Sequence, residues 1–378
     1  MKQEIKKYDW IDAMRGYAIL LVMMIHTSIL FLGDSFHLKM ITRIGDLGVT
    51  MFFIVSSYTL FNSYKNRLIV DGEKAGYFFF IRRFFRIAPL YYLAGIFYIL
   101  IAVFYHSMWI NPPIKPINII ANFTFLNGIY LPAINYIPPG GWSVGVEMLF
   151  YLTIPFLFSK IKTIHNAFIF LIISILCSFA LQIILCFLIT NYTHYSWVSL
   201  RGWHLYFWFP NQFPVFCFGI LLFFSTQTKI KYKEWMLAFS LILIILLSLI
   251  NYQNSFPRFL IQREYLYATA FCIFAFSLSK TNFKFMIKPI NQLGQVSFSA
   301  YLIHFIIIEI IGKLFRLVFH EGINSDINFI IVFALVVITT YFFSKMTYKI
   351  ERYGISVGES LIEKIKNKHS NRPDRLQA

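Results

Sequence analysis

Long apolar runs separated by short polar segments dominate the pattern of this chain. A membrane-spanning helix needs about 20 mostly apolar residues, and ten runs approach that length. They cover roughly residues 11–32, 46–64, 88–107, 141–159, 166–190, 211–227, 235–251, 264–280, 294–313 and 327–347. The pattern therefore predicts an all-α fold, a polytopic transmembrane helical bundle of about ten spans.

Composition agrees with this interpretation. Apolar residues make up 58% of the 378 positions and charged residues 13%, against about 25% charged residues in a soluble domain. The mean hydropathy is +0.64. So few charged groups cannot cover a water-exposed surface, and we expect the lipid bilayer to be the principal surroundings of the chain.

Basic residues follow the alternation of the apolar runs. With the N-terminus placed in the cytoplasm, 25 of the 34 Lys and Arg residues fall in cytoplasmic segments and 8 in segments on the other side. Because positively charged loops stay in the cytoplasm, both termini are predicted to be cytoplasmic. Topology thus accounts for the net charge of +17, and no nucleic-acid partner is expected, since no nucleic-acid-binding module is visible.

One domain is expected. Residues 1–355 are predicted to form a transmembrane domain, and residues 356–378 a short charged cytoplasmic tail that is disordered after Lys364. The stretch Tyr77–Ile87 is predicted to be an amphipathic basic-aromatic segment at the cytoplasmic surface. The four cysteines lie in apolar runs without metal-ligand spacing, so neither a metal site nor a disulfide framework is predicted.

Two segments predicted to lie outside the cytoplasm have unusual compositions. Residues 108–140 are rich in Pro, which blocks regular helix formation. Residues 191–210 carry aromatic and polar side chains, among them Trp197, Trp203 and His204. These side chains suit either an ordinary interfacial belt or a platform for sugar rings, and the belt is the favoured interpretation.

Ionisable residues within the membrane mark functional sites by default. The first run contains Asp12, Arg15 and His26, and at 100° per residue all three face one side of a helix. Glu147, on a run entering from outside, reaches a depth similar to that of His26. We therefore expect a His26–Glu147 pair, in which the carboxylate fixes the imidazole as a general base. The alternative is a structural hydrogen bond without chemistry.

A second constellation is basic. Arg82, Arg83 and Arg86 lie at the predicted cytoplasmic surface, and the guanidinium fork suits phosphate. The cluster fits the phosphates of a coenzyme A donor, although by itself it is more typical of anchoring to anionic lipid. His304, taken alone, is more typical of a packing residue. Ser57 lies mid-span, where serines often hydrogen-bond only to helix carbonyls.

Together, these motifs resemble membrane-bound acyltransferase family 3, whose bacterial members acylate surface polysaccharides. Four segments carry the resemblance: Asp12–His26 (DAMRGYAILLVMMIH), Gly48–Leu60 (GVTMFFIVSSYTL), Arg83–Tyr91 (RFFRIAPLY) and Trp142–Pro155 (WSVGVEMLFYLTIP). Weaker similarity follows in Gly294–His304 (GQVSFSAYLIH) and Tyr348–Gly354 (YKIERYG). The family usually has S-G-F where this chain has Ser56-Ser57-Tyr58, a departure that bears on the acyl-chain or acceptor preference.

The resemblance implies a stand-alone O-acyltransferase of the bacterial inner membrane, without a fused esterase-like domain. It implies a cytoplasmic acyl-CoA co-substrate such as acetyl-CoA, a saccharide acceptor and no metal. His26 and Glu147 become the expected catalytic residues, and Arg83, Arg86 and Arg15 the donor-binding residues. The expected supporting residues are Asp12, Ser57, Trp142, Ser143 and His304.

Two other classes of protein share part of this pattern. A transporter or flippase for a lipid-linked sugar would also have about ten spans and intramembrane charges, but coenzyme A should not stabilise it. A non-catalytic scaffold would tolerate neutralisation of its intramembrane charges. The acyltransferase is the favoured hypothesis of the three.

Overall fold

The computed structural model describes residues 9–31, 35–105, 107, 109–110, 115–192, 205–229, 232–252, 262–281, 288–318 and 325–370. Within these ranges the chain is helical and forms no β-strand, which confirms the all-α prediction. Each of the ten apolar runs falls on a helix. These are α1 (Asp9–Phe31), α3 (Gly48–Asp71), α4 (Ala75–Phe104), α6 (Trp142–Lys160), α7 (Ile164–Tyr192), α9 (Phe209–Ser225), α10 (Lys233–Tyr252), α11 (Arg263–Lys280), α13 (Ser297–Val318) and α14 (Ser325–Ser370).

Shorter elements connect or flank these helices. They are α2 (Phe36–Arg43), α5 (Pro116–Phe123), α12 (Lys288–Gln295) and the 3₁₀ turns η1 (Ile44–Leu47), η2 (Gly72–Lys74), η3 (Leu126–Gly128) and η4 (Leu131–Ala133). Among the described residues, seven helical stretches are long and apolar enough to cross a membrane. One of them, Phe36–Phe104, contains both α3 and α4, while α9 is only 17 residues long. The chain is thus a multi-pass membrane protein, and the figure of ten spans stays a prediction.

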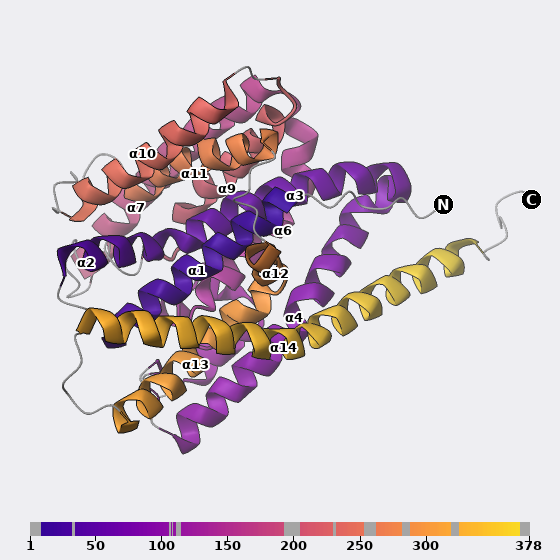
Figure 1. Ribbon diagram of the computed structural model, residues 1–378. Coiled ribbons are helices and arrows are strands. Elements are labelled where there is room, and N and C mark those ends of the chain that lie inside the picture. The colour runs from indigo at the N-terminus through magenta and orange to yellow at the C-terminus, as the bar shows by residue number, and fades with distance from the viewer. Residues whose placement is uncertain are drawn as a thin grey trace, which may run out of the picture.

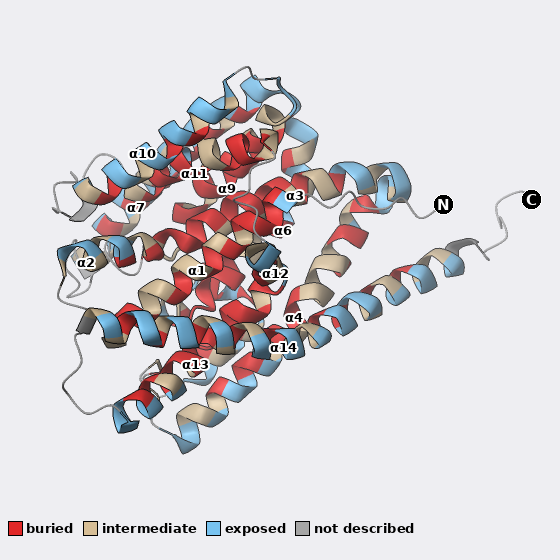
Figure 2. Ribbon diagram, viewed as in Figure 1, coloured by how far each residue is buried: buried red, intermediate tan, exposed pale blue. Residues whose placement is uncertain are grey.

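The helices are arranged around α1 and α3 (Figure 1). On one side lie α7, α9, α10 and α11, and on the other lie α4, α13 and α14, with α6 completing the centre. Buried residues fill the middle of the bundle and exposed ones its rim (Figure 2). Many exposed residues on α7 and α10 are apolar, including Leu176, Phe187 and Ile242. Contiguous apolar faces of this kind are rare on soluble proteins and match a lipid-facing rim.

The described start of α1 and the end of α14 lie at the same end of the bundle. The ring of Trp10 is 4.9 Å from that of Tyr58, so α1 starts beside the middle of α3, and both chain ends lie on the same side of Figure 1. The last residue of α3, Asp71, accepts a hydrogen bond of 2.6 Å from Lys366 near the end of α14. We call this the basic end of the molecule. Its cytoplasmic placement stays a prediction.

The C-terminal segment differs from its prediction. Helix α14 continues without a break to Ser370, so the expected disorder after Lys364 is wrong as far as that residue. Opposite charges on the α3–α4 hairpin hold the last turns: Lys366 pairs with Asp71, and Glu359 with Arg82 at 3.0 Å. The composition alone does not reveal that these charges form ion pairs with another part of the chain instead of being solvated.

Two other segments also gain more structure than expected. Tyr77–Ile87 forms the first part of the 30-residue helix α4, continuous with the apolar run that follows it. Helix α5 begins at Pro116, a position where Pro needs no N–H partner and favours a helix start. The residues Trp197, Trp203 and His204 of the predicted aromatic loop lie outside the described residues.

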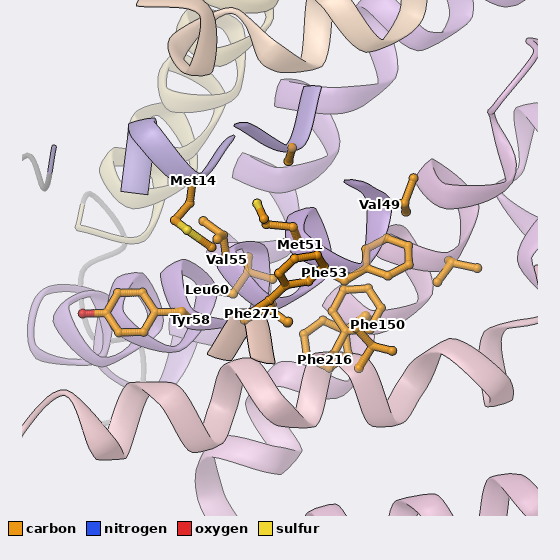
Figure 3. Packing of buried hydrophobic residues seen from close by; sticks show 14 of the residues in the cluster. Met14, Val49, Met51, Phe53, Val55, Tyr58, Leu60, Phe150, Phe216 and Phe271 are labelled. Atoms are coloured by element: carbon orange, nitrogen blue, oxygen red, sulfur yellow. The ribbon is translucent and has the colours of Figure 1, made fainter. Parts of the chain in front are cut away.

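The core combines stacked aromatic rings with close backbone contacts. Phe216 stacks on Phe53 at 4.4 Å and on Phe150 at 4.1 Å between ring centroids, which joins α3, α6 and α9 (Figure 3). At Gly294, a Cβ would lie 1.8 Å from the carbonyl oxygen of Asp12. The absence of a side chain there lets α12 pack directly against α1, which carries three of the expected site residues.

Replacement of Gly294 with Ala is expected to lower the stability of the protein by about 2 kcal/mol, because the added methyl overlaps backbone that cannot move away cheaply. The measurement is the thermal midpoint in detergent. Gly76→Ala is the matched control, since a Cβ at Gly76 would make ordinary contacts of 3.5 Å. Equal midpoints for the two variants would show that α12 does not depend on this close approach.

Candidate active site

A polar cavity of about 80 Å³ lies in the middle of the bundle, between α1, α3, α4, α6 and α13. Its lining includes three cationic side chains, one carboxylate and several hydroxyl groups. The charged and phenolic members are Arg15, Arg83, Arg86, Glu147, Tyr151 and Tyr301. Positive side chains outnumber negative ones, so the cavity suits an anionic or electron-rich ligand.

The three arginines at the start of α4 have different roles. Arg82 pairs with Asp71 at 2.8 Å and with Glu359, away from the cavity, and fastens the basic end together. Arg86 lines the cavity and pairs with Glu351 at 3.2 Å. Arg83 also lines the cavity, and within the described residues it forms no ion pair; its guanidinium lies 5.4 Å from the ring centroid of Phe79.

The arginine of the first span also lines the cavity, and we call Arg15, Arg83 and Arg86 together the basic wall. Arg15 donates to the hydroxyl of Thr59 at 3.3 Å and lies 3.9 Å from Asp12. Asp12 itself is buried and accepts a hydrogen bond from Gln295 at 3.2 Å. The structure therefore brings Arg15, Arg83 and Arg86, the three residues expected to bind the donor, to one cavity, with Asp12 behind it; donor binding by them stays a prediction.

Glu147 lies in this cavity and not beside a histidine. Its carboxylate accepts a hydrogen bond from the Ser56 hydroxyl. The expected His26–Glu147 pair is not formed, so that part of the prediction is wrong. The depth estimate placed both groups at a similar height, but it carries no information on the direction in which α6 presents its carboxylate.

The partner of His26 is a second histidine. His26 Nδ1 and His304 Nε2 are 3.0 Å apart. Aromatic rings surround the pair: the His26 ring centroid lies 4.4 Å from Phe305 and 5.9 Å from Trp109. His304 is fully buried, whereas part of His26 is exposed. His304, which alone is more typical of a packing residue, thus forms half of a histidine pair.

One tyrosine separates the histidine pair from the cavity. Tyr301 lines the cavity, and its ring centroid is 5.7 Å from that of His304. Its hydroxyl is 2.9 Å from the Ser143 hydroxyl, which also lines the cavity. Because His26 follows Arg15 by eleven residues on α1, the basic wall and the pair are about 16 Å apart along that helix.

The expected supporting residues divide into two groups. Ser143 contacts both the cavity and Tyr301. Trp142 is buried outside the lining, with its ring 4.7 Å from Phe207. Ser57 also lies outside the lining: it is buried against Gly219 of α9, and its neighbour Ser56 reaches Glu147 instead. Successive helix residues are 100° apart, so only one of two adjacent serines faces the cavity.

The residues of the site that the sequence reasoning missed include two tyrosines and a glutamate. Tyr151 and Tyr301 line the cavity, and Glu351 holds Arg86 from behind. All three occur in segments that carried the family resemblance, but a residue type alone does not reveal which way a helix presents it. Within the described part of the chain, no group of three His, Cys, Asp or Glu residues is placed to hold a metal ion.

Comparisons with known proteins place the site within a recognised domain. The model of a family described as an acyltransferase domain matches residues 8–348, which include every residue of the cavity and of the histidine pair. A relative from Acidianus two-tailed virus, named as a putative acetyltransferase, is 26% identical over 311 residues, covering 81% of this chain and 86% of the relative. No solved structure matches the chain significantly.

Proposed function

Because the chain belongs to this acyltransferase family, and is thus an enzyme that transfers acyl groups other than amino-acyl groups, we propose that it is a membrane O-acyltransferase acting on saccharides. The donor is acyl-CoA, with acetyl as the expected acyl group. The acceptor is a hydroxyl of a cell-surface or lipid-linked saccharide. A relative named as an acetyltransferase supports the choice of acyl group.

The basic wall of the cavity supports a coenzyme A donor. Arg83 contributes a guanidinium without a carboxylate partner among the described residues, and Arg15 and Arg86 lie beside it in the same lining. An unpaired arginine fork binds phosphate or carbonyl oxygens well. This wall is near the end of the bundle predicted to be cytoplasmic, where acyl-CoA is available.

The histidine pair supports the chemistry. The acceptor oxygen attacks the thioester carbonyl carbon, a C–O bond forms and the C–S bond breaks. The hydroxyl proton passes to His26 and then to the departing coenzyme A thiolate, which leaves as the thiol. General-base catalysis of this kind contributes about 10²- to 10⁴-fold. Half-buried Trp109 gives the partly exposed His26 an apolar ring surface on which the C–H face of a sugar can pack.

One observation carries the proposal: an unpaired guanidinium and a histidine pair occur on two sides of Tyr301 in the centre of the bundle. The test is incubation of the purified protein with labelled acetyl-CoA and an extract of surface glycans or lipid-linked saccharides. Label released from the saccharide by mild base supports the proposal. If acetyl-CoA is not turned over and coenzyme A does not raise the thermal midpoint, the proposal is refuted.

The same preparation tests whether His26 acts as a base or carries the acyl group. Without acceptor, a covalent relay leaves labelled acyl groups on the protein after an acid quench, whereas direct transfer leaves none. We expect direct transfer. If wild-type protein carries stoichiometric label and a His26→Gln variant carries none, His26 is a covalent acyl carrier and not a general base. The overall reaction proposed for the enzyme would be the same.

Replacement of Arg83 with Gln is expected to raise the KM for acyl-CoA about tenfold or more, which corresponds to the loss of about 1.4 kcal/mol of binding free energy. Its stability is expected to stay near that of wild type, because Arg83 has no ion pair to lose among the described residues. Steady-state kinetics with varied acyl-CoA measures this effect.

The matched control is Arg82→Gln, one residue earlier on α4. Arg82 holds Asp71 and Glu359 outside the cavity, so its loss should lower the thermal midpoint and leave the KM for acyl-CoA nearly unchanged. If the two variants raise this KM equally, the arginines act only through the charge of the basic end, and a donor site at Arg83 is ruled out.

A further inference from the structure

The hydrogen bonds of His304 determine which of its nitrogens carries the proton. Its Nδ1 lies 2.7 Å from the carbonyl oxygen of Tyr301 and 3.3 Å from that of Ala300. A carbonyl oxygen only accepts hydrogen bonds. Nδ1 of His304 is therefore the protonated nitrogen, and it is anchored to the backbone of its own helix.

The other nitrogen of His304 then has a lone pair. The side chain is fully buried, and within the described residues no carboxylate contacts the ring. A buried charge without a counter-ion is strongly unfavourable, so the imidazole is neutral and holds a single ring proton. With that proton on Nδ1, Nε2 of His304 can only accept a hydrogen bond.

This acceptor determines the tautomer of His26. The atom facing His304 Nε2 at 3.0 Å is His26 Nδ1, which must donate and therefore carries the proton. His26 Nε2 is therefore the nitrogen with the free lone pair.

We propose that His304 is a positioning residue, which holds His26 in the tautomer whose Nε2 is the base for the acceptor hydroxyl. This inference rests on the proposed function, in which His26 removes the hydroxyl proton. A free imidazole exchanges between two tautomers, and only one of them presents a basic Nε2 to the substrate. In the tightly packed centre of α1 and α13, a neutral ring performs the task that a carboxylate performs in soluble triads.

A neutral acceptor also suits the membrane. When Nε2 takes the acceptor proton, His26 becomes an imidazolium whose Nδ1–H still points at His304 Nε2. The pair then carries one charge in total and no bond has to rearrange. A carboxylate at the position of His304 would remain charged in the resting enzyme, where burial makes a charge unfavourable.

The test compares two substitutions of similar size. His304→Gln keeps an acceptor, the side-chain amide oxygen, near the position of Nε2, whereas His304→Leu removes it. We expect kcat to fall at least about 100-fold in His304→Leu and no more than about 10-fold in His304→Gln. The KM for acyl-CoA should stay within about twofold of wild type in both variants, because His304 does not line the cavity that contains the basic wall.

A purely structural role predicts a different result. In that case both variants lose kcat in proportion to the fall of their thermal midpoints, and Gln gives no rescue. Wild-type kcat in His304→Leu together with an inactive His26→Gln would overturn the positioning role alone. An active His26→Gln would instead overturn the proposed function on which it rests.

A spectroscopic measurement on the unmodified protein guards against variants that do not fold. In ¹⁵N-histidine spectra of the wild-type enzyme in nanodiscs, with the His26 signals assigned by their loss in His26→Gln, we expect Nδ1 to be protonated and Nε2 bare. A proton on Nε2 and a bare Nδ1 would overturn the inference regardless of the behaviour of either His304 variant.

Discussion

Replacement of His26 with Gln is expected to lower kcat for acyl transfer about 10²- to 10⁴-fold, the contribution typical of a general base. Gln retains a polar side chain of similar reach, so the contact with His304 is replaced rather than deleted, and the thermal midpoint should change little. The KM for acyl-CoA should also be near that of wild type, because the basic wall is about 16 Å away along α1. Single-turnover assays with labelled acetyl-CoA measure the chemical step directly.

The matched control is His165→Gln, which changes an exposed histidine near the start of α7. It should transfer acyl groups at the wild-type rate. If His26→Gln transfers acyl groups as fast as this control, proton removal occurs elsewhere, and the cavity carboxylate Glu147 becomes the candidate base. A fall in both variants would indicate a general sensitivity to histidine substitution and would remove the support for a dedicated base.

The sequence predicts the helices of this protein well because hydrophobicity and helix geometry are local properties. Each of the ten apolar runs became a helix, since a chain in a bilayer has to satisfy its backbone hydrogen bonds within each span. That Arg15 and Arg83 line one cavity does not follow from such local geometry; only the family resemblance grouped these two arginines in one expected donor site.

Contacts between helices are predicted less well, because they depend on how each helix is rotated against its neighbours. Glu147 and His26 reach similar depths, yet Glu147 faces Ser56 and His26 faces His304. The adjacent residues Ser56 and Ser57 are equally polar, and only the packing of α9 against α3 decides which one enters the cavity. Rotation of this kind is set by glycine contacts and ring stacking spread over several helices.

The sequence did not indicate that Glu351 belongs to the site. It lies beyond the last apolar run in a charged segment, where a carboxylate is normally solvated. In the structure it is 2% exposed and pairs with Arg86 at 3.2 Å. One of its oxygens, Oε2, has no hydrogen-bond partner within the described residues. The carboxylate thus holds a cavity-lining arginine from outside the cavity.

Replacement of Glu351 with Gln is expected to destabilise the protein by about 3 kcal/mol, the lower end of the range for breaking a buried ion pair. The lower end applies because about a third of the Arg86 side chain stays exposed. Without the carboxylate, the Arg86 charge remains beside Arg15 and Arg83 with less compensation. The thermal midpoint in detergent measures the change, with Glu363→Gln, on the same helix, as the control.

A double substitution separates the stability of this pair from its function. Arg86→Met with Glu351→Met removes both charges and should restore the thermal midpoint to near that of wild type, because apolar replacements of a buried pair are often neutral or better. The double variant should nevertheless keep a raised KM for acyl-CoA, since Arg86 is one of the three guanidinium groups assigned to the donor. If both the thermal midpoint and the KM for acyl-CoA return to wild-type values, Arg86 serves only to neutralise the charge of Glu351. The donor site would then consist of Arg15 and Arg83.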